Sequence, residues 1–179
     1  SGEEFTQEEL VKGIHDGIAN GAITPVVCCA NDTLSGVDML LDSVVTMLPS
    51  PNERKLEKVD GELIDYDENK PFKAVIFKTV ADPFVGKISY VKVVRGKLAS
   101  KSEIVNTAGE PLKFGKLVTV IGKKQEEVSE ICAGDIAAVT KLDCNTGDTL
   151  CDPSDTKALD GITFPKACYF MAAGISYGS

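Results

Sequence analysis

Lysine and arginine side chains are concentrated in one part of this chain, where they could bind phosphate groups. Between Phe72 and Gln125 there are eleven basic residues and only three acidic ones. The whole chain still carries a formal net charge of −8, because the segments on both sides are acidic. A basic block of this kind indicates a polyanionic partner, most often a nucleic acid. The alternative is that these lysines are solvated outward positions of a sheet, where they also discourage edge-to-edge aggregation.

The sequence contains no set of residues that would support catalysis or hold a metal ion. It has a single histidine, His15, and neither of the glycine-rich phosphate-binding patterns G-x-x-x-x-G-K-[ST] and G-x-G-x-x-G. The six cysteines include no C-x-x-C pair, which is poor spacing for zinc. We therefore predict no catalytic residue and no metal site, and we expect these residues by themselves to be enzymatically inactive.

Composition indicates a folded protein of the cytoplasm. The chain has 179 residues, of which 43% are hydrophobic and 26% charged, as in ordinary globular domains. No apolar run approaches the roughly 20 residues of a membrane span, so we expect no membrane partner. The polar, acidic opening SGEEFTQEE predicts no signal peptide. Cysteines among apolar residues are then expected to stay reduced.

The first 48 residues predict a helix, a buried strand and a second helix. Thr6 and Glu9 have capping-box spacing, and a 3.6-residue apolar period follows as far as the Asn20-Gly21 stop. The apolar run Val26–Ala30 does not alternate, which is typical of a strand buried on both faces of a parallel sheet. Ser35 is the expected cap of the second helix, which Pro49 ends.

One buried strand needs neighbouring strands, and nothing later in the chain supplies parallel partners. We therefore interpret residues 1–48 as the C-terminal remnant of a larger α/β domain. The alternative is that they form an irregular cap on the rest of the chain. An exposed sheet edge here would also favour self-association of the isolated chain.

The remainder is predicted to be a linker, a β-barrel and the start of a further domain. Residues 49–71 are polar and bounded by prolines, as linkers are. From residue 72 the hydrophobic period changes to two, and turn residues recur regularly, which favours a closed antiparallel β-barrel over 72–161. The expected strands are 72–80, 86–95, 102–106, 113–121, 127–132, 136–142 and 149–151. The fold class is thus mainly β, and residues 162–179 are assigned to the next domain.

Three runs in this region are specific enough to be recognised. They are Phe77–Lys87 (FKTVADPFVGK), Ala133–Val139 (AGDIAAV) and Thr146–Cys151 (TGDTLC). Together they closely resemble domain II of bacterial elongation factor G. Upstream, Pro25–Cys28 and Gly36–Pro51 resemble the end of that family's GTP-binding domain, and Phe164-Pro165-Lys166 resembles the entry to its third domain.

The resemblance implies a ribosome-dependent GTPase that binds GTP with Mg²⁺ and drives translocation of tRNA and mRNA. It also implies that the barrel packs on the GTPase domain and contacts small-subunit ribosomal RNA, which agrees with the basic block. Phosphate contacts would supply salt-dependent affinity. The RNA-binding candidates are Lys87, Lys92, Arg95, Lys97, Lys123 and Lys124.

Two departures from the family pattern favour a divergent relative, such as an elongation-factor-G-like paralogue. Cys29, Ala30 and Asn31 stand where the family has Gly-Ser-Ala next to the guanine base, so they are the nucleotide-binding candidates without the usual serine. The tail Ala172–Ile175 also differs from the family's continuation. The alternatives to an elongation factor are a stand-alone RNA- or protein-binding barrel and a relative of ribosomal-protection or release factors.

Overall fold

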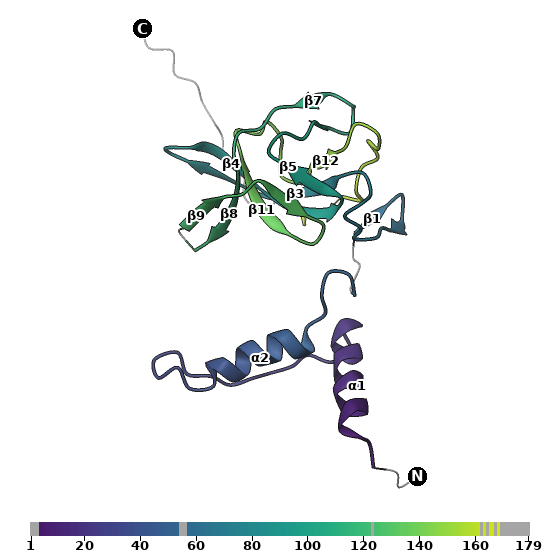
Figure 1. Cartoon of the computed structure of the whole chain (residues 1–179), viewed down its shortest axis with the longest axis vertical. Coiled ribbons are helices and arrows are strands. Elements are labelled where there is room, and N and C mark those ends of the chain that lie inside the picture. Colours follow the sequence, from purple (N-terminus) through teal and green to yellow (C-terminus); the bar gives the residue numbers. More distant parts are fainter. Residues whose placement is uncertain are drawn as a thin grey trace.

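A computed structural model describes most of the chain: residues 4–53, 57–122 and 124–161, together with residues 163, 165, 166 and 168. Figure 1 shows two helices gathered at one end of the molecule and all the strands at the other. The predicted start of a further domain, 162–179, lies outside the described residues except for the four single positions named above.

Helix α1 (Gln7–Ala19) begins as the sequence predicts. The Glu9 N–H donates to Thr6 Oγ1 at 3.3 Å, and the Thr6 N–H donates to Glu9 Oε2 at 2.9 Å, so the capping box is complete. These two bonds satisfy backbone donors that have no partner within the helix. The helix ends at Asn20, and Ile18 is its one buried large side chain among those described.

The predicted buried strand over residues 26–30 does not form. The segment is extended but unpaired apart from one bridge between Ala30 and Ser35, and Val26 is 87% exposed. An apolar run becomes a strand only where neighbouring strands accept and donate its backbone hydrogen bonds, and no described segment does so here.

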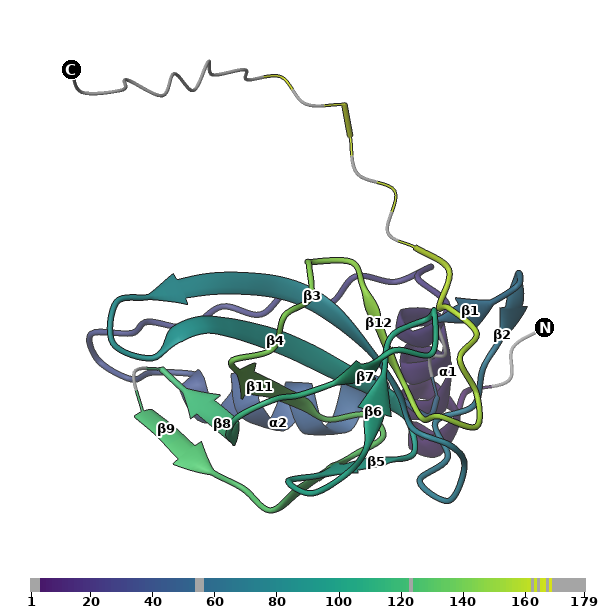
Figure 2. The ribbon, with the colours of Figure 1, turned by 90° about the horizontal axis from the view of Figure 1, so that it is seen from above.

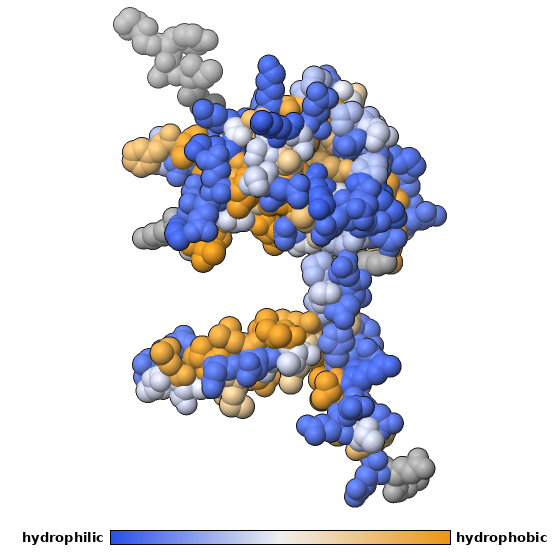
Figure 3. Space-filling view, in the orientation of Figure 1, coloured by the Kyte–Doolittle hydropathy of each residue, from blue (hydrophilic) through white to orange (hydrophobic). Residues whose placement is uncertain are grey.

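Helix α2 (Val37–Met47) forms where it was expected, but its cap differs. Gly36, at φ 73°, occupies the capping position instead of Ser35, so the helix has no side-chain cap. A Cβ on Gly36 would stand 2.9 Å from the carbonyl oxygen of Cys28, so only glycine fits. None of the residues of α2 is buried, and Figure 3 shows apolar side chains exposed along this part of the molecule.

Most of the strands lie in the region from residue 72 onward, where the sequence predicts them. They are β1 (Lys58–Val59), β2 (Glu62–Leu63), β3 (Lys73–Asp82), β4 (Gly86–Arg95), β5 (Lys97–Ala99), β6 (Ile104–Val105), β7 (Pro111–Leu112), β8 (Leu117–Ile121), β9 (Lys124–Glu127), β10 (Glu130–Cys132), β11 (Ile136–Thr140) and β12 (Thr149–Cys151). The predicted bounds of β4 and β12 are confirmed to the residue. The predicted strand 127–132 is divided between β9 and β10, and β1, β2, β5 and β7 were not predicted.

The prediction of a closed barrel is wrong. Eight strands form one curled antiparallel sheet in the order β7-β6-β12-β3-β4-β11-β8-β9 (Figure 2). Within the described residues, the edge strands β7 and β9 do not pair with each other. Strands β5 and β10 form a separate pair. The chain turns sharply between β4 and β5 at Gly96, which has φ 71°. Directly after this turn, β5 pairs with β10 and not with a strand of the eight-stranded sheet.

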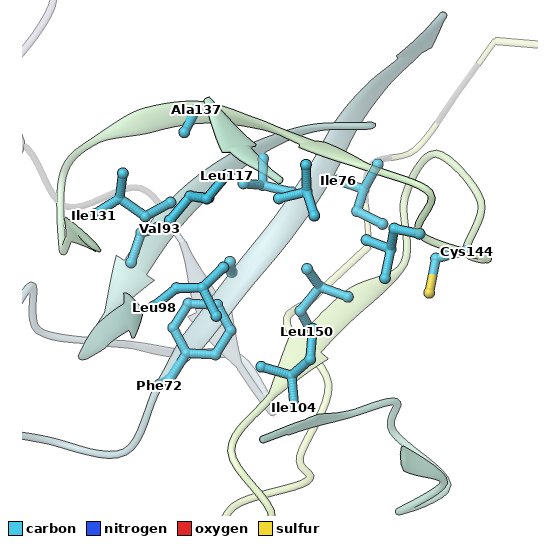
Figure 4. Close-up of a cluster of buried hydrophobic side chains, with 14 residues drawn as sticks. Phe72, Ile76, Val93, Leu98, Ile104, Leu117, Ile131, Ala137, Cys144 and Leu150 are labelled. Carbon is cyan, nitrogen blue, oxygen red and sulfur yellow. The ribbon is translucent and has the colours of Figure 1, made fainter. Parts of the chain in front are cut away.

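The concave side of the sheet encloses the main core. Figure 4 shows side chains from several strands converging there. The buried members include Phe72, Ile76, Val91, Val93, Leu98, Ile104, Leu117, Ile131, Val139 and Leu150. Each fully buried aliphatic side chain of this kind contributes about 1.5–3 kcal/mol relative to exposure.

Part of the predicted linker is ordered and packs on the convex side. The hairpin of β1 and β2 is followed by Ile64 and Tyr66, which are buried with Val94 and Leu159 in a second cluster. A polar, proline-bounded composition did not reveal these two apolar anchors. The sheet domain is therefore packed against the segment through which the chain enters it.

Candidate nucleic-acid interface

Two of the predicted RNA-binding residues, Lys92 and Arg95, are held by carboxylates of this chain. Lys92 Nζ lies 2.5 Å from Glu57 Oε1 and 5.5 Å from the centre of the Tyr66 ring. Arg95 pairs with Asp155 and donates from Nε to the Pro71 carbonyl at 3.2 Å. Both side chains are more than two-thirds covered. Their positive charge is thus largely used within the fold.

The electrostatics of the Lys92 site agree with this geometry. Burial opposes ionisation of Glu57, but hydrogen bonds from Lys92 and Tyr66 outweigh burial and hold the pKa of Glu57 below its usual value. Burial likewise acts to lower the pKa of Lys92, yet the bonds to Glu57 and Tyr66 raise it overall. Burial and the Glu57 carboxylate together raise the pKa of Tyr66. The pair is therefore charged at neutral pH.

Lys97 and Lys124 are also in ion pairs, but in more exposed ones. Lys97 Nζ lies 3.1 Å from Glu68 Oε2 and 3.7 Å from Glu130 Oε1, and its hydrogen bond to Glu68 raises its pKa. Lys124 Nζ lies 2.5 Å from Glu126 Oε1, and 74% of the Lys124 side chain is exposed. Exposed pairs of this kind are weak and exchange readily with solvent or ligand. Lys123 lies outside the described residues.

Lys87 differs from the other candidates. It stands at the opposite end of β4 from Arg95, roughly 27 Å away at about 3.4 Å per residue. Its carbonyl accepts the N–H of Lys141 at 3.1 Å, so two lysines lie side by side. Neither has an ion-pair partner within the described part of the chain. The six candidates therefore do not form one cluster.

The turn between β3 and β4 contains an exposed aromatic residue, Phe84, three positions before Lys87. Asp82 Oδ1 accepts from the backbone N–H groups of Phe84 and Val85, both at 2.8 Å. These two bonds lower the pKa of Asp82. The turn holds Phe84 at its apex with 95% of its surface exposed. We call Phe84, Lys87 and Lys141 the β3–β4 corner.

Phe84 and Lys141 were not among the RNA-binding residues predicted from the sequence. The Asp82-Pro83 pair did predict the turn, and an aromatic residue directly after such a turn is the signal that could have indicated exposure. Lys141 carried no signal, because its place beside Lys87 follows from the register of β11 on β4. An exposed aromatic ring can stack on an unpaired base, and lysines without ion-pair partners can bind the neighbouring phosphates.

The nucleotide-binding candidates lie in the turn before α2. Cys29 and Ala30 line a hollow of about 480 Å³ together with Gly36 and Met39. The Ala30 N–H donates to the Ser35 carbonyl at 2.9 Å, so it is not free to donate to a base. A guanine contact from this segment would have to come from Cys29 or Asn31, both of which are exposed.

Two negative observations concern only the described residues. No three or more His, Cys, Asp or Glu side chains among them are grouped so as to hold a metal ion. Neither α1 nor α2 has the length and apolar character that crossing a bilayer requires.

Comparison with known proteins is consistent with this architecture. Residues 71–153 match the family model of elongation factor G domain 2. A crystal structure of a protein from Thermus thermophilus is similar to the chain, with a TM-score of 0.66 and 30% sequence identity. The similarity covers 84% of this chain but 21% of that one, so the chain spans about a fifth of the relative's length. Over residues 71–153, the sheet domain of this chain is thus similar to domain 2 of elongation factor G.

Proposed function

We propose that this chain is part of a ribosome-dependent translation elongation GTPase, which acts in the cytoplasm and translocates tRNA and mRNA. The match of residues 71–153 to elongation factor G domain 2 supports this proposal. In it, the sheet domain packs on the GTPase domain and contacts small-subunit ribosomal RNA, and residues 1–48 are the last part of the GTPase domain.

The observation that carries the RNA contact is the β3–β4 corner. Its two lysines are joined by a backbone hydrogen bond and have no ion pair within the described residues, and Phe84 in the preceding turn is 95% exposed. Ribosomal RNA offers phosphates to lysines and unpaired bases to aromatic rings. A protein partner would more often be met by a buried apolar patch than by one exposed ring flanked by cations.

The other candidate cations that the structure describes would have to break an ion pair within the chain before they could bind a phosphate. Lys124 could exchange its exposed pair with Glu126 for a phosphate at little cost. Lys92 and Arg95 would have to leave largely covered carboxylates, which opposes their use. Lys97 is intermediate between these cases, and Lys123 is proposed from the sequence alone.

We further propose that the full-length protein binds GTP with Mg²⁺ and that the segment Cys29–Asn31 lies near the guanine base. The chain's own contribution would be a backbone N–H of Cys29 or Asn31, because the Ala30 N–H is used within the turn. When bound, GTP supplies the phosphoanhydride bond whose hydrolysis drives translocation. The absence of the family's serine favours an elongation-factor-G-like paralogue with altered guanine recognition.

The RNA contact can be tested by co-sedimentation of the chain with purified small ribosomal subunits between about 50 and 200 mM salt. A Lys87→Ala/Lys141→Ala double variant should reduce the slope of log affinity against log salt by about 0.7–0.9 for each phosphate that is no longer bound. The matched control is Lys101→Ala/Lys113→Ala, which removes two exposed lysines elsewhere in the domain. An equal effect of both double variants, or an unchanged slope in the first, would overturn the assignment of the corner.

A further inference from the structure

The segments by which the chain enters and leaves the sheet domain lie against each other. We call residues 57–70 the entry segment and residues 152–160 the exit segment. Figure 2 shows the exit segment, in yellow-green, passing beside the β1–β2 hairpin of the entry segment. The Asp160 N–H donates to the Lys58 carbonyl at 2.7 Å, and the Gly61 N–H donates to Asp160 Oδ2 at 3.1 Å. The two segments therefore form a joint layer on the sheet.

The near end of the exit segment is anchored by a covered cluster of charges. Lys73 Nζ lies 3.1 Å from Asp155 Oδ1, and the Lys73 side chain is completely buried. Lys73 also donates to the carbonyls of Asp155 and Lys157, and Arg95 pairs with the second oxygen of the Asp155 carboxylate. Burial opposes ionisation of Asp155, but the Lys73 and Arg95 contacts outweigh it and lower its pKa. Removing the carboxylate would leave a buried ammonium without its counter-ion.

The far end is held by weaker contacts. Lys157 Nζ lies 2.8 Å from Asp60 Oδ2, but both side chains are about 70% exposed. An exposed pair is screened by salt and adds little stability. Leu159 supplies the main apolar contact, because it is buried against Ile64, Tyr66 and Val94. This end thus depends on one apolar side chain, a few hydrogen bonds and a surface ion pair.

We propose that the exit segment is a strap with a permanent anchor at Asp155 and the Lys157 backbone, and a releasable outer end formed by the Lys157 side chain and residues 158–160. Opening of the outer end lets the part of the protein that follows residue 160 change direction while the sheet stays folded. Because the outer end is tied to the entry segment, its opening also uncouples the chain that enters the sheet domain from the chain that leaves it. This inference does not depend on the proposed RNA contact.

Hydrogen–deuterium exchange of the chain tests the strap by comparing amides at its two ends. The Asp152 N–H donates to the Phe72 carbonyl near the anchor, whereas the Leu159 and Asp160 N–H groups donate to Thr149 and Lys58 at the outer end. Raising salt from about 0.1 M to about 1 M shortens the screening length about threefold. Exchange at Leu159 and Asp160 should then rise severalfold, with Asp152 and the β3 and β4 amides unchanged.

Variants separate the anchor from the outer end. Lys157→Ala should reproduce the effect of salt, and Leu159→Ala should exceed it. Asp155→Asn should raise exchange over the whole exit segment by about tenfold or more, as expected when one partner of a buried ion pair is removed. Lys124→Ala breaks a similarly exposed pair outside the strap and serves as the matched control.

The proposal is overturned if Asp152 and Asp160 always exchange together, or if β3 and β4 lose protection whenever the outer end opens. If Asp155→Asn does not fold, the salt series and Lys157→Ala still decide the question in a folded protein.

Discussion

The ammonium group of Lys92 lies 2.5 Å from Glu57 Oε1, and the hydroxyl of Tyr66 donates to the other oxygen of the same carboxylate. Glu57 of the entry segment thus binds both Lys92, from the central strand β4, and Tyr66, whose ring lies against the Lys92 ammonium group. Because Glu57 is charged and partly covered, the contact should be sensitive to pH and to removal of the charge.

Acid should weaken the sheet domain through Glu57. Since its pKa is lowered on folding, Glu57 stabilises the folded state above its ordinary value of 4.5, and this contribution is lost as pH falls toward the lower folded pKa. Glu57→Gln should cost about 1–3 kcal/mol at neutral pH, as for hydrogen bonds to charged groups. Urea unfolding of both proteins at several pH values measures this. The prediction would be contradicted if the free energies of unfolding of Glu57→Gln and the unchanged protein differed as much at strongly acidic pH as at neutral pH.

Gly96 should be far less replaceable than other glycines with positive φ. A Cβ at Gly96 would lie 2.6 Å from the Lys70 carbonyl oxygen and from Phe72 Cα, which are backbone atoms that cannot move aside cheaply. Gly109 has a similar φ of 80° but nothing within 4 Å. Gly109→Ala should therefore cost about 1–2 kcal/mol for the left-handed conformation alone, and Gly96→Ala several kcal/mol more. The free energies of unfolding from urea titration compare the two directly.

Local sequence patterns predicted those parts of the fold that local interactions determine. The Thr6–Glu9 cap and the bounds of β4 follow from residue types and spacing within a few positions. The open form of the sheet could not be predicted in this way, because whether the edge strands β7 and β9 meet is decided only when the whole sheet has formed. The unpaired run 26–30 shows the same limit, since its strand-like composition says nothing about available partners.

The candidate site was predicted less well than the fold. Lys92 and Arg95 resemble free surface cations in the sequence, but Glu57 and Asp155 come from distant segments and pair with them only after folding. Conversely, Lys141 joins Lys87 through strand register. Charge density along a chain therefore identifies a basic domain, but not which of its cations remain unpaired.

The cysteines should differ widely in reactivity. Burial raises the pKa of the Cys144 and Cys151 thiols, so little thiolate forms near neutral pH, and both side chains are covered. Cys28, Cys29 and Cys168 are exposed. Alkylation followed by mass spectrometry should modify these three first, with Cys144 and Cys151 reacting only on unfolding. Early modification of Cys151 in the folded chain would show that the exit segment uncovers it.

Substitution of Phe84 in the β3–β4 turn should weaken binding to the small ribosomal subunit without changing the stability of the fold. Phe84 is 95% exposed, so Phe84→Ala should change the free energy of unfolding by no more than about 0.5 kcal/mol. In contrast, Leu98→Ala, in the core, should cost about 2–5 kcal/mol. If the ring stacks on an unpaired base, Phe84→Ala should lower affinity for small ribosomal subunits by about 1–3 kcal/mol.

Two further variants distinguish stacking from simple apolar contact and from turn geometry. Phe84→Leu keeps an apolar side chain without a π face, so it should bind as weakly as Phe84→Ala if stacking is responsible. Asp82→Ala keeps the ring but removes the acceptor for the Phe84 and Val85 N–H groups. It should speed amide exchange of those two residues and weaken binding partly, because the ring is then presented in many orientations. Full binding by Phe84→Leu would instead indicate an apolar contact, and full binding by Phe84→Ala would remove the ring from the interface.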